Sequence, residues 1–124
     1  MAIFPRRKRP EDGIQRAVLE HLRLRGPRTA YYFHVANGGG RLPVEAAILR
    51  GLGVQAGVPD LIIIHDGKTY GLELKADGSK PTKFQIEAQD AMRTAGAEVA
   101  VAVGLDAALQ QLERWQLLRG RHES

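Results

Sequence analysis

The chain has 124 residues, a formal net charge of +4 and no cysteine. This length suggests one domain that buries about two-thirds of its unfolded surface. The lack of cysteine excludes disulfides and thiolate metal sites. The longest aliphatic run, Leu61-Ile62-Ile63-Ile64, is too short to span a bilayer. The first residues also lack the apolar run of a secretory signal, so we expect a soluble intracellular protein with no membrane partner.

The basic balance permits binding to nucleic acid without establishing it. Four positive residues, Arg6 to Arg9, precede the first periodic segment. We expect residues 1–10 to form a basic flexible arm, residues 11–120 a single domain, and residues 121–124 a tail. The arm either contacts phosphates non-specifically or serves only to keep the chain in solution.

The first predicted helix runs from about Pro10 to Arg25. Its apolar residues recur at helical spacing and form one stripe: Ile14, Val18, Leu19 and Leu22. At about 100° per residue, Glu11 lies near the middle of this stripe and Glu20 lies on the opposite side. Glu11 is therefore either a helix-capping residue or an acidic group of a site.

A β-rich run predicts a strand over residues 30–36. The loop Asn37-Gly38-Gly39-Gly40-Arg41 follows. Its glycines allow the backbone to approach a ligand closely, and Arg41 can fork onto phosphate. A plain flexible turn is the alternative. A short helix over residues 43–50 comes next, with Val44, Ala47 and Ile48 expected to point inward.

Residues 58–75 predict a hairpin that turns at Asp66-Gly67. With a two-residue turn, residues whose numbers sum to 133 face each other, so Asp60 faces Glu73. Lys75 projects from the same face, two residues further on. Opposed carboxylates cost about 0.2–1 kcal/mol, and a divalent cation such as Mg²⁺ would compensate that cost. A solvated hairpin end with an incidental ion pair is the alternative.

Thr82 is a plausible N-cap for a helix that extends to about Ala95. The expected buried stripe of this helix is Phe84, Ala88, Ala91, Met92 and Ala95, with Gln85 at its flank. A strand over residues 98–104 and a helix over residues 106–118 complete the chain. The element order predicts an α/β protein with a buried central hairpin that carries charge at one end.

The sequence resembles a known group, the VRR-NUC family within the PD-(D/E)xK nuclease superfamily. The resemblance covers nearly the whole chain, and GVPDLII together with LELK is its specific part. The matching segments are Glu11 with Ile14-Gln15, Asn37-Gly38 with Arg41, LRGLGVQAGVPDLII (49–63), LELKADG (72–78), and Gln85 with Met92 and Gly96. The resemblance implies a restriction-endonuclease-like core, with a mixed central sheet flanked by helices in the order αβαββαβα.

The resemblance also implies a site that depends on Mg²⁺ or Mn²⁺. Asp60, Glu73 and the backbone carbonyl of Leu74 would be metal ligands. Glu11 would complete the acidic set, directly or through water. Lys75 would orient or deprotonate the attacking water and stabilise charge on the phosphate, and Gln85 would steady the lysine or the metal-bound water. The loop residues Asn37, Gly38 and Arg41 would contact nucleic acid. The loop Lys80-Pro81-Thr82-Lys83 departs from the family pattern, which bears only on how the helix is capped.

The function that the resemblance implies is a structure-selective DNA endonuclease similar to Holliday junction resolvases, from the cytoplasm of a bacterium or encoded by a phage. Such an enzyme acts as a homodimer because a four-way junction presents two symmetric cleavage points. Ile86 and Leu117 lie off their helical stripes and are candidates for a dimer surface. A flap or nicking nuclease, a ribonuclease, and a non-catalytic DNA-binding module stay open as alternatives.

Overall fold

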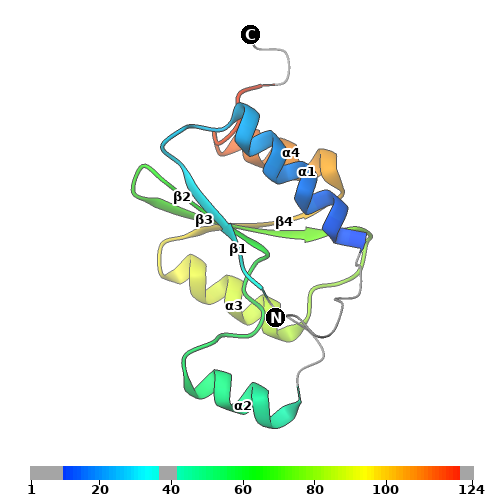
Figure 1. Ribbon diagram of the computed structural model, residues 1–124, viewed down its shortest axis with the longest axis vertical. Helices are drawn as coiled ribbons and strands as arrows, with labels where there is room; N and C mark the ends of the chain where they lie inside the picture. The colour runs from blue at the N-terminus through cyan, green and yellow to red at the C-terminus, as the bar shows by residue number, and fades with distance from the viewer. Residues whose placement is uncertain (1–9, 37–41, 121–124) are drawn as a thin grey trace, which may run out of the picture. The chain divides into compact units, whose positions relative to one another are not determined.

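The computed structural model describes residues 10–36 and 42–120, which form four helices and four strands (Figure 1). The predictions for residues 1–9, for the loop residues Asn37, Gly38 and Arg41, and for the tail after residue 120 concern positions outside the described residues. In chain order the elements are α1 (Pro10–Arg25), β1 (Tyr31–His34), α2 (Pro43–Gly51), β2 (Leu61–His65), β3 (Lys68–Lys75), α3 (Lys83–Thr94), β4 (Glu98–Val103) and α4 (Leu105–Arg114). This is the predicted order. None of the helices within the described ranges has the length and apolar character of a membrane-spanning segment.

The four strands form one mixed sheet in the order β1-β2-β3-β4. Strand β2 is antiparallel to both β1 and β3, while α3 connects β3 to β4, the kind of crossover that parallel neighbours require. Leu61 pairs with Leu72 and His65 with Lys68, so paired residues sum to 133 as predicted. Asp66 and Gly67 both have positive φ, the conformation that a tight type I′ turn demands.

The chain divides into two compact units. One, here called the α1–α4 unit, contains α1, the end of β3 with the residues after it, the end of β4, and α4. The other, here called the hairpin unit, contains β1, α2, β2, most of β3, α3 and the start of β4.

In the α1–α4 unit the two helices pack side by side (Figure 1). The core contains Val18 and Leu22 from the predicted stripe of α1, and Ala108, Leu109 and Leu112 from α4. Helix α4 ends earlier than predicted because Gln116 adopts a left-handed conformation, and the N–H of Leu117 then donates to the carbonyl of Leu112 at 2.9 Å. This turn buries Leu117 completely, so its assignment to a dimer surface was wrong.

In the hairpin unit Leu61, Ile63 and Leu72 are buried on one face of the sheet. The expectation for α3 was partly wrong, because Phe84, Ala91 and Ala95 are exposed while Gln89 is buried. The inward face of this helix is centred on Gln85, Gln89 and Met92, which rotates Phe84 toward solvent. The expectation for α2 was wrong throughout, since none of its residues is buried.

Candidate active site

Asp60 lies directly before β2, at the open end of the hairpin. Because Leu61 pairs with Leu72, one further step in the register sets Asp60 opposite Glu73. The backbone around Asp60 is held from β1: the N–H of Val35 donates to the Asp60 carbonyl at 2.9 Å, and Nδ1 of His34 lies 2.8 Å from the same oxygen. The backbone at Asp60 is therefore held by the neighbouring strands and is not part of a free loop.

Close packing behind Asp60 holds the start of β2 against β3. Pro59 is fully buried, and a Cβ added to Gly71 would lie only 2.8 Å from its Cγ. Gly71 is the residue opposite Ile62 in the register, two positions before Glu73. A glycine is needed there because any side chain would push Pro59 and the adjoining Asp60 away from β3.

Glu73 is buried, with 4% of its surface exposed, and its Oε2 accepts a hydrogen bond from Nε2 of Gln85 at 2.8 Å. The other end of the Gln85 amide is also held. Oε1 of Gln85 accepts from the backbone N–H of Thr82 at 2.9 Å, and Oγ1 of Thr82 accepts from the N–H of Gln85 at 3.2 Å. This capping box confirms Thr82 as the N-cap, and it orients the amide so that its NH₂ group points at Glu73.

Helix α3 can approach this site because Gly57 has no side chain. Its φ is +78°, and a Cβ there would lie 2.3 Å from the backbone carbonyl of Phe84. Both the conformation and the space therefore require glycine. The contact seats the first turn of α3, including Gln85, against the segment that leads into Asp60.

Lys75 is the last residue of β3 and belongs to the α1–α4 unit. Strand alternation gives its side chain the same face as Glu73. Its backbone carbonyl accepts a hydrogen bond from the N–H of Gly104 at 2.8 Å, which ties the end of β3 to the end of β4. The last residue of the ExK motif is thus tied to the residue that follows β4.

Glu11 lies in the first turn of α1 and is half-buried. The helix dipole favours a carboxylate at this position without any ligand. Glu11 belongs to the α1–α4 unit, whereas Asp60 and Glu73 belong to the hairpin unit. Its role as a metal ligand stays a prediction.

The oxygen donors at the hairpin end suit a hard divalent cation, because carboxylate and carbonyl oxygens are the ligands that Mg²⁺ and Mn²⁺ prefer. A carboxylate as buried as Glu73 also needs compensation for its charge. Within the described ranges no group of three or more His, Cys, Asp or Glu side chains is placed to hold a metal. A cation on Asp60 and Glu73 would therefore take water, carbonyl and substrate oxygens as its other ligands.

Two polar residues at this site were missed by the sequence reasoning. His34 was read only as part of a β-rich run, yet its ring lies against the Asp60 carbonyl. Gln89, 6% exposed, follows Gln85 by one helical turn, and its Nε2 is buried without a hydrogen-bond partner in the described residues. The signal for Gln89 was its spacing of four from Gln85, which puts both amides on one helix face.

The chain was compared with family models, with curated proteins and with solved structures. No family model matches the chain, and neither does any curated protein. Among solved structures, a protein described as "VRR_NUC domain protein" is similar with a TM-score of 0.68 and 26% identity, covering 90% of this chain and 92% of its own. A second, described as "VRR_NUC domain", shares the fold with a TM-score of 0.58 and 19% identity, covering 86% of this chain and 97% of its own. The likeness to the first structure covers about nine-tenths of both chains and supports a VRR-NUC family assignment.

Proposed function

We propose that this protein is a metal-dependent endonuclease that hydrolyses phosphodiester bonds in DNA. The observation that carries the proposal is the buried carboxylate of Glu73, held by Gln85 and set in register opposite Asp60. A polar cluster of this kind costs stability, and an oriented pair of acids on a hairpin suits a site that handles phosphate chemistry. The likeness to a protein described as "VRR_NUC domain protein" supports the same conclusion.

Asp60, Glu73 and the carbonyl of Leu74 would hold Mg²⁺ or Mn²⁺, with Glu11 completing the acidic set through water. The cation, when bound, supplies acidity to its water and neutralises charge that develops on the phosphate. Lys75 orients the attacking water, and its ammonium offsets negative charge on the scissile phosphate; in its neutral form it can take the water proton. Gln85 keeps the Glu73 carboxylate in one orientation.

Branched DNA is the proposed substrate, and a homodimer is the proposed form of the enzyme. Helix α2 supports the second copy, because Val44, Ile48 and Leu52 recur at every fourth position and are all exposed, Ile48 by 58%. An antiparallel pair of α2 helices related by a two-fold axis at Ile48 would set Val44 against the partner subunit's Leu52. Glu45 in the first turn would then lie near the partner subunit's Arg50 in the last turn. The stripe and the charges are thus self-complementary.

The test is cleavage of a labelled panel that contains a four-way junction, a 5′ flap, a nicked duplex, a linear duplex, a single strand and an RNA hairpin, with Mg²⁺, Mn²⁺ or EDTA. Lys75→Ala is the matched variant, because it removes the ammonium without removing an acid. We expect paired symmetric cuts on the junction, lost in EDTA and in the variant. Cutting confined to the flap or the nicked duplex would identify a flap or nicking nuclease in place of a junction resolvase. DNA binding without metal-dependent cutting of any substrate would leave a DNA-binding module.

A further inference from the structure

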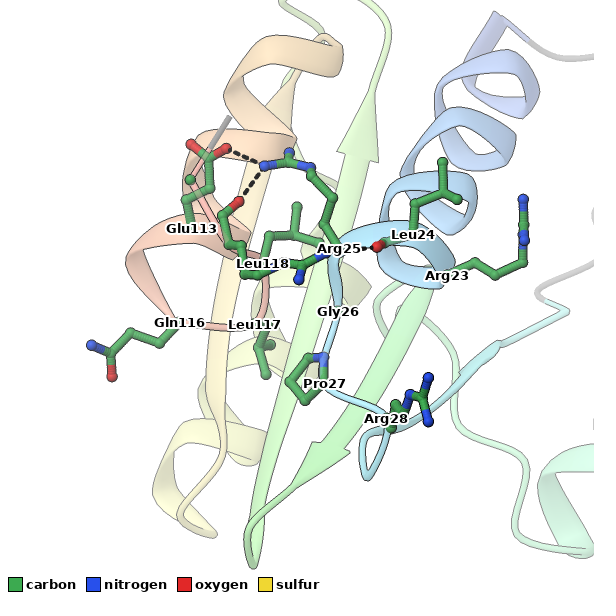
Figure 2. Close-up of a pocket in the computed structure, with 12 residues that line it drawn as sticks. Arg23, Leu24, Arg25, Gly26, Pro27, Arg28, Glu113, Gln116, Leu117 and Leu118 are labelled. Atoms are coloured by element: carbon green, nitrogen blue, oxygen red, sulfur yellow. Dashed lines mark hydrogen bonds and ion pairs between the residues drawn. The ribbon is translucent and has the colours of Figure 1, made fainter. Parts of the chain in front are cut away.

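A cavity of about 920 Å³ lies in the α1–α4 unit, at the C-terminal end of α1 and therefore at the opposite end of that helix from Glu11 (Figure 2). Its lining includes four arginines, Arg23, Arg25, Arg28 and Arg119, and one acid, Glu113. Four positive charges less one negative charge leave a formal charge of +3. Arg23 is partly neutralised from outside the cavity by Glu20, at 2.6 Å. The lining remains strongly positive, which favours an anionic ligand.

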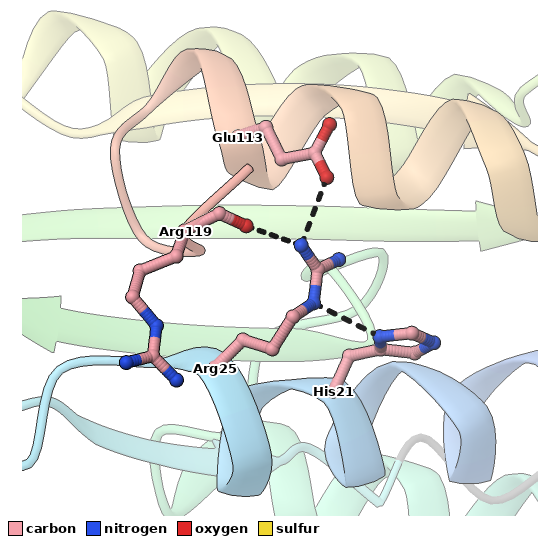
Figure 3. Close-up of polar contacts among 4 residues, drawn as sticks. All are labelled: His21, Arg25, Glu113 and Arg119. Atoms are coloured by element: carbon pink, nitrogen blue, oxygen red, sulfur yellow. Dashed lines mark hydrogen bonds and ion pairs between the residues drawn. The ribbon is translucent and has the colours of Figure 1, made fainter. Parts of the chain in front are cut away.

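Arg25 is the centre of this lining (Figure 3). Its Nε donates to Nδ1 of His21 at 3.2 Å, and its Nη1 donates to Glu113 at 3.1 Å and to the backbone carbonyl of Arg119. The side chain is 15% exposed. Its Nη2 is buried without a hydrogen-bond partner in the part of the chain that the structure describes. A charged donor left in this state is costly, and an anionic oxygen is the acceptor that would satisfy it best.

Stabilisation of the helix end accounts for only part of this cluster. Arg119 donates from Nη2 to the Leu24 carbonyl at 3.1 Å, so it caps the last turn of α1. Arg25 joins α1 to the segment after α4. Neither role involves Arg28, which follows the helix, is exposed, and has no side-chain partner within the described ranges. The cavity therefore offers a guanidinium that is not committed to the fold and a second one with a donor to spare.

Guanidinium groups are the side chains best shaped for phosphate, because their parallel N–H donors match two phosphate oxygens. We propose that this cavity binds phosphate groups of the DNA backbone. The assignment of DNA rests on the proposed function. Glu11 and Arg25 are fourteen residues apart on one helix, which is about 21 Å at 1.5 Å per residue. At 3.4 Å per base pair this is about six base pairs of duplex, so the cavity would anchor an arm of the substrate.

The experiment that tests this proposal measures binding of a fluorescent 20-base-pair duplex at several salt concentrations. It is carried out in EDTA, where no cleavage occurs. The variants are Arg28→Ala, Arg28→Glu and Arg28→Lys, and exposed Arg28 can be changed without disturbing the core. We expect Arg28→Ala to weaken binding several-fold and to lower the slope of log K against log salt by about 0.9, the contribution of one phosphate contact. Arg28→Glu should weaken binding further, and Arg28→Lys should restore the slope.

The matched control is Arg114→Ala, which removes an exposed arginine of α4 that does not line the cavity. Equal losses in Arg28→Ala and Arg114→Ala would overturn the proposal, because the effect would then belong to overall charge. A thermal shift with inorganic phosphate, matched in ionic strength with chloride, separates the two sources of phosphate. Stabilisation by phosphate that Arg28→Glu abolishes, with duplex binding unchanged, would make this a site for free phosphate and overturn the DNA assignment.

Cleavage assays on the same variants distinguish failure of this inference from failure of the proposed function. At saturating DNA, Arg28→Ala should retain the wild-type cleavage rate, because Arg28 is not part of the proposed acid and lysine set. Normal cleavage and unchanged DNA binding in Arg28→Ala would contradict phosphate binding in the cavity, while the proposed nuclease activity would stand. If Arg28→Ala weakens DNA binding but the wild-type protein cleaves no substrate, the result would support phosphate binding in the cavity and would contradict the proposed nuclease activity.

Discussion

Both ends of the Gln85 amide are in use, and this makes one side chain responsible for a helix cap and for the orientation of an acid. The oxygen accepts from Thr82 and the nitrogen donates to Glu73. The cap alone is worth about 0.5–2 kcal/mol. The bond to Glu73 contributes to stability as well, but its larger effect should fall on the chemistry of the carboxylate.

We therefore expect Gln85→Leu to lower cleavage by about 10- to 100-fold, the range seen when a partner of a ligating group is removed. Thr82→Ala is the control, because it weakens the cap and leaves the amide of Gln85 free to donate to Glu73. Urea unfolding should show that both variants lose stability. Equal loss of cleavage in the two variants would mean that Gln85 acts only through the fold.

Replacement of Gln89 should stabilise the protein, whereas replacement of Gln85 should destabilise it. Its buried Nε2 lacks a partner in the described residues, and an unsatisfied buried amide costs about 1–3 kcal/mol. Gln89→Met keeps the volume and removes the polar atoms, so it should raise the free energy of unfolding by about 1 kcal/mol. Gln85→Met, in which a paired amide is lost, should lower it. A fall in stability for Gln89→Met would show that this amide has a partner in solution, such as an ordered water.

At the scale of elements, the approach of α3 to the segment before β2 depends on one glycine. Gly57→Ala should destabilise the protein by at least about 2 kcal/mol, because it combines left-handed strain with a steric clash against the backbone of Phe84. Gly53→Ala is a close control: its φ is +99°, but nothing lies within 4 Å of the added Cβ. The difference between the two variants in urea unfolding measures the contact alone. Similar losses would mean that the clash is relieved by a small movement of α3.

Helix α1 has acids on different sides with different expected roles. The hydrogen bond from Arg23 lowers the pKa of Glu20, and the charge of Arg23 adds to this effect. A pKa below that of the unfolded chain contributes stability at higher pH, and that stability is lost as pH falls through the folded pKa. Because Glu20 is exposed, solvent screens the pair and the contribution is small.

NMR titration should place the pKa of Glu20 below that of an unpaired glutamate, and Arg23→Ala should raise it again. Glu20→Ala should leave cleavage unchanged, whereas Glu11→Ala should reduce it strongly if Glu11 completes the acidic set. An equal effect of the two substitutions on cleavage would show that neither face of α1 is directed at the chemistry.

At the scale of the whole molecule, the feature that demands an explanation is the exposed apolar stripe of α2. A single domain rarely leaves a complete helix stripe in water without a partner for it. Ile48→Glu should shift the protein from dimer to monomer in light scattering, and it should convert paired cuts on a junction into single ones. Ala46→Glu, a change on the same helix away from the stripe residues, serves as the control. An unchanged mass for Ile48→Glu would exclude α2 as the dimer surface.

Local chemistry was enough to predict a large part of this protein from its sequence. The turn at Asp66-Gly67, the register that sets Asp60 opposite Glu73, and the cap at Thr82 depend on residues within about fifteen positions of one another, where turn preference and alternation decide the outcome. The order of the elements followed from the same local signals. The family motifs also lie in this hairpin, so they could be found without a structure.

Only the tertiary structure decided which helix faces are covered. Phe84 was expected inside and Gln89 was not considered, because an apolar stripe predicts burial only when a neighbour packs against it. The stripe of α2 has no such neighbour in the described chain, and α3 is rotated by its contacts with Gly57 and Glu73. The arginine cavity includes a hydrogen bond between Leu24 and Arg119, 95 positions apart, so no local sequence pattern could predict it. Such contacts arise when distant segments fold together. In the sequence, the residues that make them are only isolated charged residues.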